Sequence, residues 1–195
     1  MISTAQLEAV AQVANTEGHE IAAIRGRHRG PTLIIVGGIH GNEPAGVLAA
    51  QRVLPRLQEM RHELRGEIVL LRGNTRALKS KARYIDADLN RQWTSENVRL
   101  SDSGDGPEKS ELLEQGELLM VLKEVVRRAR GEIYFLDLHT TSAEGKPFAT
   151  VGDTLRNRRF ALTFPVTIVL GLEEQIDGTL LEYINNLGAI TLGFE

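Results

Sequence analysis

The chain has 195 residues, and its 23 lysines and arginines against 26 aspartates and glutamates give a formal net charge of −3 at pH 7. It contains no cysteine, which excludes disulfide bonds, iron–sulfur clusters, cysteine-ligated zinc and thiol nucleophiles, so any metal site must use histidines and carboxylates. Nucleic-acid-binding proteins usually carry a basic excess, which this chain lacks. The composition is that of an ordinary globular protein, with no nucleic-acid partner expected.

No targeting or membrane segment is predicted. The N-terminal residues lack a basic stretch followed by an apolar one, which a secretory signal requires. The longest apolar stretch, around residues 33–39, is far shorter than the ~20 residues of a membrane helix. We therefore expect a cytoplasmic protein without membrane partners, in keeping with the missing cysteines. The sequence leaves homo-oligomer formation open.

Predicted strands and helices alternate along the chain. Short apolar or alternating runs predict strands, and apolar residues at helical spacing predict helices, most strongly over 112–129. In chain order we expect a strand at 20–25, a strand at 32–37, a helix at 43–60, a strand at 67–71, a polar loop at 101–107, a helix at 112–129, a strand at 133–138, a strand at 166–170, a helix at 180–186 and a strand at 189–194. This order is typical of a single α/β domain with a mainly parallel sheet.

Histidines and carboxylates follow the predicted strands. Parallel sheets bind ligands at the carboxyl ends of their strands, and these ends lead into His40 and Glu43, into His139, and into Glu195. A His-x-x-Glu pair alone is weak evidence, because a helix-starting glutamate beside a loop histidine gives the same pattern. The flanking glycines and the further histidine favour a metal site, since His, Glu and His with one open position form a catalytic zinc set without sulfur.

The segment 84–91 is the next dense group of polar residues. Asp86, Asp88, Asn90 and Arg91 alternate with apolar residues. One interpretation is a solvated loop with internal salt bridges. The other is a substrate clamp, in which a guanidinium binds a carboxylate through two hydrogen bonds and an amide adds directional ones. A carboxylate here could also orient a ligand histidine.

The remaining histidines have no clear chemical context. We expect His19, His28 and His62 on the surface, and Trp93 in the core.

Five short motifs carry a family resemblance. They are Gly37–Glu43, Asn74–Ala77, Ala82–Arg91, Asp137–Thr141 and Gly193–Glu195. In this order they resemble the succinylglutamate desuccinylase/aspartoacylase family of the zinc carboxypeptidase clan, and the string Arg83–Arg91 within the third motif looks closer to aspartoacylase than to the desuccinylase. The resemblance implies a zinc-carboxypeptidase-like, three-layer α/β sandwich with a mainly parallel mixed sheet. It also implies a zinc-dependent amidohydrolase that cleaves the amide bond of a small N-acyl amino acid.

The resemblance further implies the metal-binding residues. His40, Glu43 and His139 would bind one Zn²⁺ ion per chain, and Asp88 would orient His40.

Four other residues would act on the substrate. Arg83 would polarise the scissile carbonyl and stabilise the oxyanion, while Asn90 and Arg91 would hold the carboxylate of the amino acid. Glu195 would be the general base that takes a proton from the attacking water and passes it to the leaving amine.

Two departures from the family pattern qualify this picture. Family members continue after this glutamate into a β-rich C-terminal domain that is absent here, so we expect residues 1–195 to be a catalytic domain from a truncated chain. No lysine or arginine lies between Phe164 and Leu187, where aspartoacylase has an arginine for a second carboxylate, which argues against N-acetylaspartate as substrate.

Two alternatives stay open: a carboxypeptidase-like zinc peptidase or amidase, and an inactive truncated metal- or ligand-binding domain.

Overall fold

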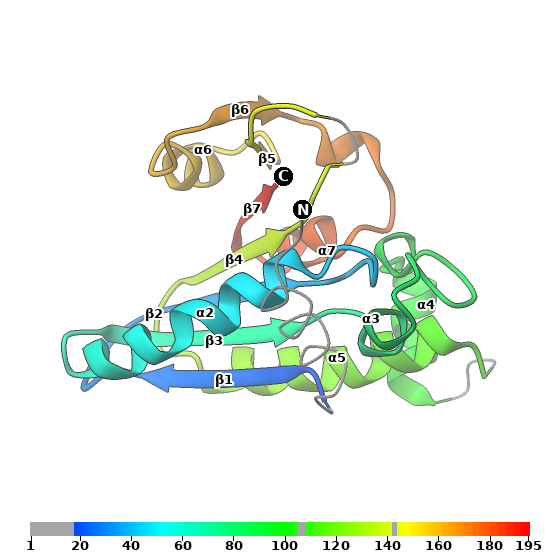
Figure 1. Ribbon diagram of the computed structural model, residues 1–195, viewed down its shortest axis with the longest axis horizontal. Helices are drawn as coiled ribbons and strands as arrows, with labels where there is room; N and C mark the ends of the chain where they lie inside the picture. Colours follow the sequence, from blue (N-terminus) through cyan, green and yellow to red (C-terminus); the bar gives the residue numbers. More distant parts are fainter. Residues whose placement is uncertain (1–17, 105–107, 142–143) are drawn as a thin grey trace, which may run out of the picture.

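The computed structural model describes residues 18–104, 108–141 and 144–195. Its centre is a seven-stranded sheet with the order β1-β3-β2-β4-β7-β5-β6 (Figure 1). The β1–β3 and β5–β7 pairs are antiparallel and the other neighbours are parallel, which confirms the predicted mainly parallel mixed sheet. The strands are β1 (Glu20–Arg25), β2 (His28–Gly37), β3 (Arg65–Arg72), β4 (Ile133–Leu138), β5 (Phe148–Val151), β6 (Thr167–Leu170) and β7 (Ile190–Phe194).

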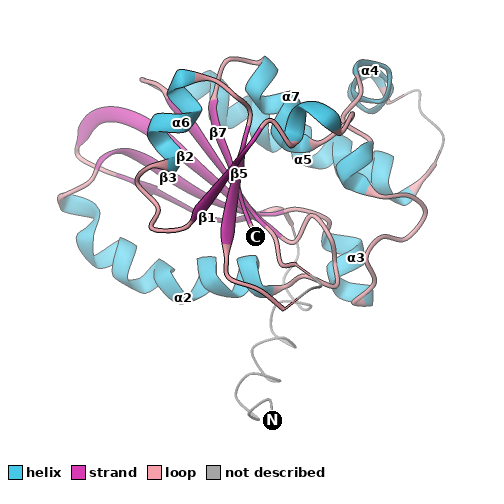
Figure 2. Cartoon of the chain, turned by 90° about the horizontal axis from the view of Figure 1, so that it is seen from above, coloured by secondary structure: helices cyan, strands magenta, loops and turns pink. Residues whose placement is uncertain are grey.

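Helices cover both faces of the sheet and give the three layers that the family resemblance implies (Figure 2). Helix α2 (Ala45–Glu59) lies on one face, and α5 (Ser110–Arg128) and α7 (Leu180–Asn186) lie on the other. Shorter helices complete the fold: α3 (Thr75–Ser80), α4 (Ser95–Ser103) and α6 (Leu155–Ala161). In the ranges that the structure describes, none of the helices has both the length and the apolar character to cross a membrane.

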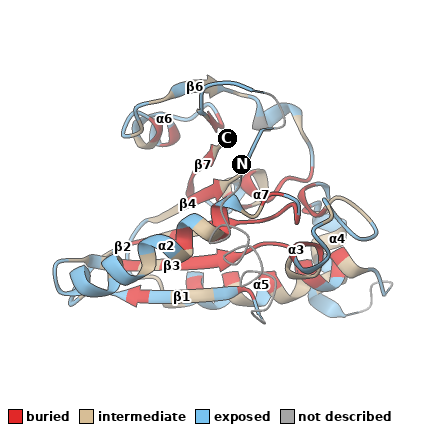
Figure 3. Cartoon of the chain, viewed as in Figure 1, coloured by how far each residue is buried: buried red, intermediate tan, exposed pale blue. Residues whose placement is uncertain are grey.

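The largest cluster of buried side chains lies between the sheet and helices α5 and α7. Ile34 and Val36 of β2 meet Leu118 and Leu122 of α5 there, and Trp93 joins them at 3% exposure, as predicted for a core residue. Full burial of one such large apolar side chain contributes about 1.5–3 kcal/mol. Figure 3 shows this burial along the central strands and the inner sides of the helices. Packing against the helices therefore stabilises the position of the central strands.

The sequence does not predict β5, α3, α4 or α6. The predicted loop over 101–107 is wrong for residues 101–103, which form the end of α4. The hydroxyl of Thr94 caps this helix by accepting a hydrogen bond from the Asn97 N–H at 3.3 Å, and Gly104 ends it with a φ of +74°. Residues 105–107 of that loop lie outside the described residues.

The carboxyl ends of four parallel strands lie in one row. Gly37 of β2 pairs with Arg72 of β3 and with Leu138 of β4, which in turn pairs with Phe194 of β7. The segments that follow these strands therefore start from one edge of the sheet.

Candidate active site

His40, Glu43 and His139 lie together at this edge. Glu43 stands between the two rings: its Oε1 is 3.1 Å from His40 Nδ1, and its Oε2 is 3.3 Å from His139 Nδ1. One donor atom from each residue lies within 4.8 Å of the others. His40 and Glu43 are buried. The structure thus brings together the three predicted metal ligands, from two separate strand ends.

The loop after β2 can make this approach because of its glycines. Gly38 adopts a φ of +74°, which favours glycine over other residues. A Cβ on Gly41 would lie 2.0 Å from the Ala77 carbonyl carbon, so any side chain at this position would push the loop away from α3. The Gly41 N–H also donates to the Arg83 carbonyl at 3.1 Å, which links the two motifs.

The far nitrogen of each ring is held by an aspartate. His40 Nε2 lies 3.0 Å from Asp88 Oδ1, and His139 Nε2 lies 3.0 Å from Asp137 Oδ2. An ionised carboxylate only accepts hydrogen bonds, so these contacts assign a proton to each Nε2 and leave each Nδ1 as the nitrogen that can bind a metal ion or a second proton. Both Nδ1 atoms face oxygens of Glu43: His139 Nδ1 lies at hydrogen-bond distance, and His40 Nδ1 is buried without a hydrogen bond to the residues that the structure describes. A bound cation would take the place of protons on the two Nδ1 atoms and satisfy both nitrogens together with Glu43.

Asp88 has the position that the sequence predicts for a residue that orients His40. The corresponding role of Asp137 is not predicted. The available signal was its place two residues before His139 on a strand, because alternate strand residues point to the same face.

The electrostatics of the group favour ionised carboxylates. Burial raises the pKa of Glu43, but His139 and His40 against its oxygens outweigh this and hold that pKa well below its usual range. The pKa of Asp88 is likewise lowered, because His40 and Arg83 outweigh its burial. The ionised Glu43 and the two imidazoles therefore form a donor set with the chemistry that a divalent cation requires, and the ionised Asp88 adds negative charge behind His40.

Arg83 reaches into the same site from the segment that follows α3. Its Nη2 donates to Asp88 Oδ2 at 3.0 Å, and its Nη1 donates to Glu43 Oε1 at 3.4 Å. Its side chain is 44% exposed, so the guanidinium is anchored yet accessible to a ligand.

Asn90 and Arg91 have different surroundings. Asn90 is buried, and its side-chain oxygen Oδ1 accepts a hydrogen bond from the Leu180 N–H at 2.9 Å. This oxygen therefore binds the start of α7. Arg91 is exposed, and its Nη1 donates to the Asn90 carbonyl at 2.7 Å. Of the two, Arg91 is the more available to a substrate.

Glu111 on α5 holds the segment that carries these residues. Its buried carboxylate accepts hydrogen bonds from the backbone N–H groups of Ile85, Asp86 and Ala87 at 2.7, 2.9 and 3.1 Å, and from Asn74 Nδ2 at 3.0 Å. Burial raises the pKa of Glu111, but these hydrogen bonds outweigh it and the pKa falls below its ordinary value. Sequence analysis missed this residue. A glutamate beside the apolar stripe of a predicted helix was the available signal.

Glu195 follows β7. Its N–H donates to the Phe148 carbonyl at 2.9 Å, and its own carbonyl accepts from the Phe148 N–H at 3.2 Å, so the first residue of β5 fixes its backbone. It lines a cleft of about 270 Å³ together with the three predicted metal ligands, Arg83, Asn90 and Arg91. Of the predicted site residues, only Asp88 lies outside the lining of this cleft.

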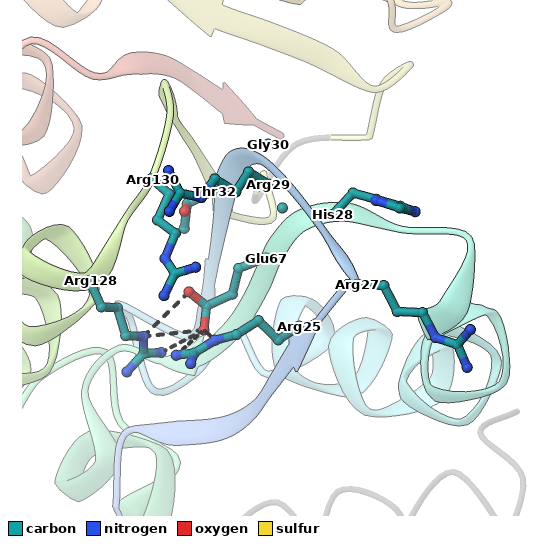
Figure 4. Close-up of a pocket in the computed structure, with 11 residues that line it drawn as sticks. Arg25, Arg27, His28, Arg29, Gly30, Thr32, Glu67, Arg128 and Arg130 are labelled. Atoms are coloured by element: carbon teal, nitrogen blue, oxygen red, sulfur yellow. Dashed lines mark hydrogen bonds and ion pairs between the residues drawn. The ribbon is translucent and has the colours of Figure 1, made fainter.

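A second cavity, of about 150 Å³, lies where the amino end of β2 meets the start of β3 (Figure 4). Its wall is basic, but Arg25 and Arg128 converge on Glu67, with guanidinium–carboxylate distances of 3.3 and 3.1 Å. Figure 4 shows Arg27 and His28 extending away from this group. The cavity contains none of the predicted site residues.

The expectation for His19 is wrong. The residue is 5% exposed, and its Nδ1 lies 3.0 Å from the Arg72 carbonyl oxygen at the end of β3. Its Nε2 faces Glu114 and Glu117 of α5 at 3.6 and 3.5 Å. Arg76 binds both carboxylates at 2.7 Å. His19 is therefore buried because it packs into an ion-paired group between β3 and α5.

Comparisons with known proteins support the family resemblance that the sequence motifs carry. Residues 29–195 match the model of the succinylglutamate desuccinylase/aspartoacylase catalytic domain. The succinylglutamate desuccinylase of Pseudomonas fluorescens (strain SBW25) is 29% identical over 121 residues, which are 62% of this chain and 34% of that protein. The match thus spans about a third of that relative.

Solved structures show the same fold. The crystal structure of the succinylglutamate desuccinylase from Chromobacterium violaceum superposes with a TM-score of 0.69 and 19% identity, covering 96% of this chain and 65% of that one. A metallo-carboxypeptidase from Burkholderia cenocepacia superposes with a TM-score of 0.59 and 14% identity, covering 99% and 60% of the two chains. The expected zinc-carboxypeptidase-like fold is confirmed, and because the family model matches most of its length, the chain belongs to the succinylglutamate desuccinylase/aspartoacylase family.

Proposed function

We propose that this protein is a zinc-dependent amidohydrolase that removes the acyl group from a small N-acyl amino acid. The observation that carries the proposal is the pair of histidine Nδ1 atoms facing opposite oxygens of Glu43, at 3.1 and 3.3 Å, inside a cleft that also contains Arg83 and Glu195. Family membership supports the same chemistry.

His40, Glu43 and His139 would hold one zinc ion per chain. Each imidazole is oriented by an aspartate on its other nitrogen, an arrangement that fixes the tautomer and raises ligand basicity. When bound, zinc supplies Lewis acidity, which acidifies water and polarises a carbonyl group.

The protein's own side chains would perform the remaining steps. Arg91, which has no carboxylate partner among the described residues, would bind the carboxylate of the substrate, and the amide of Asn90 would contribute from beside it. Arg83 would donate to the carbonyl oxygen as negative charge develops on it, a contribution of several kcal/mol in enzymes of this type. The carboxylate of Glu195 would accept a proton from the attacking water and deliver it to the amine nitrogen as the amide bond breaks.

We also propose that the chain works as one catalytic α/β domain in the cytoplasm. All strands of the described residues join one sheet, and the absence of cysteine agrees with a reducing compartment.

Substrate profiling of zinc-loaded protein tests the proposal. We expect release of a free amino acid from N-acyl amino acids but not from dipeptides; the reverse preference would establish the carboxypeptidase-like alternative. His139→Ala should lose both zinc and activity, whereas His62→Ala, a change at an exposed histidine, should keep both. A protein that binds zinc and hydrolyses neither class would be the inactive binding domain.

A further inference from the structure

One wall of the cleft indicates the kind of amino acid that the proposed substrate contains. The segment between β6 and α7 contributes Leu172 and Ile176 to the lining, and α7 adds Leu181. Leu172 is 40% exposed, so apolar surface is available there for a ligand to cover. Along this wall the non-apolar lining residue is Thr179, which is uncharged.

This wall lies directly against the segment that carries Arg91. The Leu180 N–H donates to Asn90 Oδ1 at 2.9 Å, and the Trp93 N–H donates to the Gly178 carbonyl at 3.0 Å. A Cβ on Gly178 would lie 2.7 Å from the Arg91 carbonyl oxygen. Arg91, Leu172 and Ile176 line the same cleft, so an amino acid whose carboxylate binds Arg91 would have this wall within reach of its side chain.

The charges that line the cleft suit a substrate with one carboxylate. Arg83 and Arg91 are the basic side chains other than the two histidines in this lining, and Arg83 already binds Asp88 and Glu43. Arg91 makes no ion pair with any residue that the structure describes. The next basic residue along the chain from this wall, Arg159 on α6, is not among the residues that line the cleft.

A second carboxylate would be poorly placed here. The cleft already contains the carboxylates of Glu43, Asp137 and Glu195, and a further negative charge against an apolar wall would lose hydration without gaining a partner. An apolar side chain in the same place would instead gain by leaving water.

We infer that the released amino acid has a neutral, apolar side chain that packs against Leu172 and Ile176, in contrast to a dicarboxylic amino acid. This inference rests on the proposed deacylase function.

Three N-acetylated amino acids of nearly equal shape test the inference: the leucine, asparagine and aspartate derivatives. With zinc-loaded protein we expect kcat/KM for N-acetylleucine to exceed that for N-acetylaspartate by about tenfold or more, since even one methylene in an apolar pocket is worth about 10–200-fold. N-acetylasparagine separates the two causes, because it removes the charge of aspartate without adding apolar surface.

A gain-of-function variant sharpens the test. Ile176→Arg places a cation on the wall, so it should raise kcat/KM for N-acetylaspartate, lower it for N-acetylleucine and reverse the preference. Leu170→Arg is the matched control, because Leu170 is exposed on β6 outside the cleft lining, and it should leave the ratio unchanged. Should Ile176→Arg fail to fold, calorimetric binding of leucine and aspartate to the unmodified protein decides the question, with tighter binding of leucine expected.

The outcomes separate the inference from the function on which it rests. Zinc-dependent hydrolysis that favours N-acetylaspartate would overturn the apolar side chain and leave the deacylase standing. Failure to hydrolyse any N-acyl amino acid with zinc bound would overturn the proposed function, and this inference with it.

Discussion

Replacing Glu111 by glutamine should destabilise the protein and loosen the segment that carries Arg83 and Asp88. Glu111 Oε1 accepts hydrogen bonds from the Ile85 N–H and from Asn74 Nδ2, and Oε2 accepts from the N–H groups of Asp86 and Ala87. Glutamine can replace only one of these oxygens, because its NH₂ group would face N–H donors on the other side.

The magnitude follows from these contacts. At least two hydrogen bonds to a buried carboxylate are lost, and each such bond contributes about 1.5–3 kcal/mol, so the free energy of unfolding should fall by about 3–6 kcal/mol. Urea unfolding measures this through the fluorescence of Trp93, the single tryptophan, which is buried. The midpoint should fall while the slope with urea stays constant. Hydrogen exchange of residues 83–88 should become faster, and kcat/KM for hydrolysis should fall as well.

Glu96→Gln is the matched control, since Glu96 lies exposed on α4. It should shift the unfolding free energy by no more than about 0.5 kcal/mol. If Glu111→Gln cost less than about 1 kcal/mol, the carboxylate would not be the anchor of this segment, and the reasoning would be refuted.

Three further predictions concern the site and its support. Asp88→Ala removes the carboxylate that orients His40 and should weaken zinc binding about 10–100-fold in equilibrium dialysis; unchanged affinity would contradict that role. Glu195→Gln should lower kcat about 10²–10⁴-fold while the zinc stays bound, and loss of metal from this variant would show that Glu195 is a ligand instead. Because the folded-state pKa of Glu111 is lowered, its contribution to stability is fully present above its unfolded pKa of about 4.3 and is lost as the pH falls through the folded-state pKa. Urea midpoints below pH 5 should therefore fall more steeply in the wild type than in Glu111→Gln, and equal slopes would count against this linkage.

The parts of the fold that the sequence predicts well are those with strong local patterns. Strands β2, β4 and β7 each contain a mostly apolar run within the sheet, and their parallel pairing sets their carboxyl ends in one row. That row is why the residues after the predicted strands, His40, His139 and Glu195, meet in one cleft. Here the rule for parallel sheets and the family motifs point to the same edge.

The parts that the sequence does not predict depend on distant partners. Strand β5 has four residues and pairs antiparallel with β7. No local sequence pattern predicts this strand or its pairing. His19 is buried because Arg76 compensates the glutamates beside it. The Asn90 carbonyl binds the Leu180 N–H, 90 residues away, and Glu111 likewise acts on a segment remote in sequence. Each of these contacts exists only after the helices have packed on the sheet.

The most direct test of the proposed chemistry is a titration of metal-free protein with zinc, followed by the release of free amino acid from an N-acyl amino acid. The account predicts no hydrolysis without metal, a linear rise with added zinc and a break at one equivalent per chain, from one site at His40, Glu43 and His139. Full hydrolysis by the metal-free protein, or none with one equivalent of zinc bound, would contradict it.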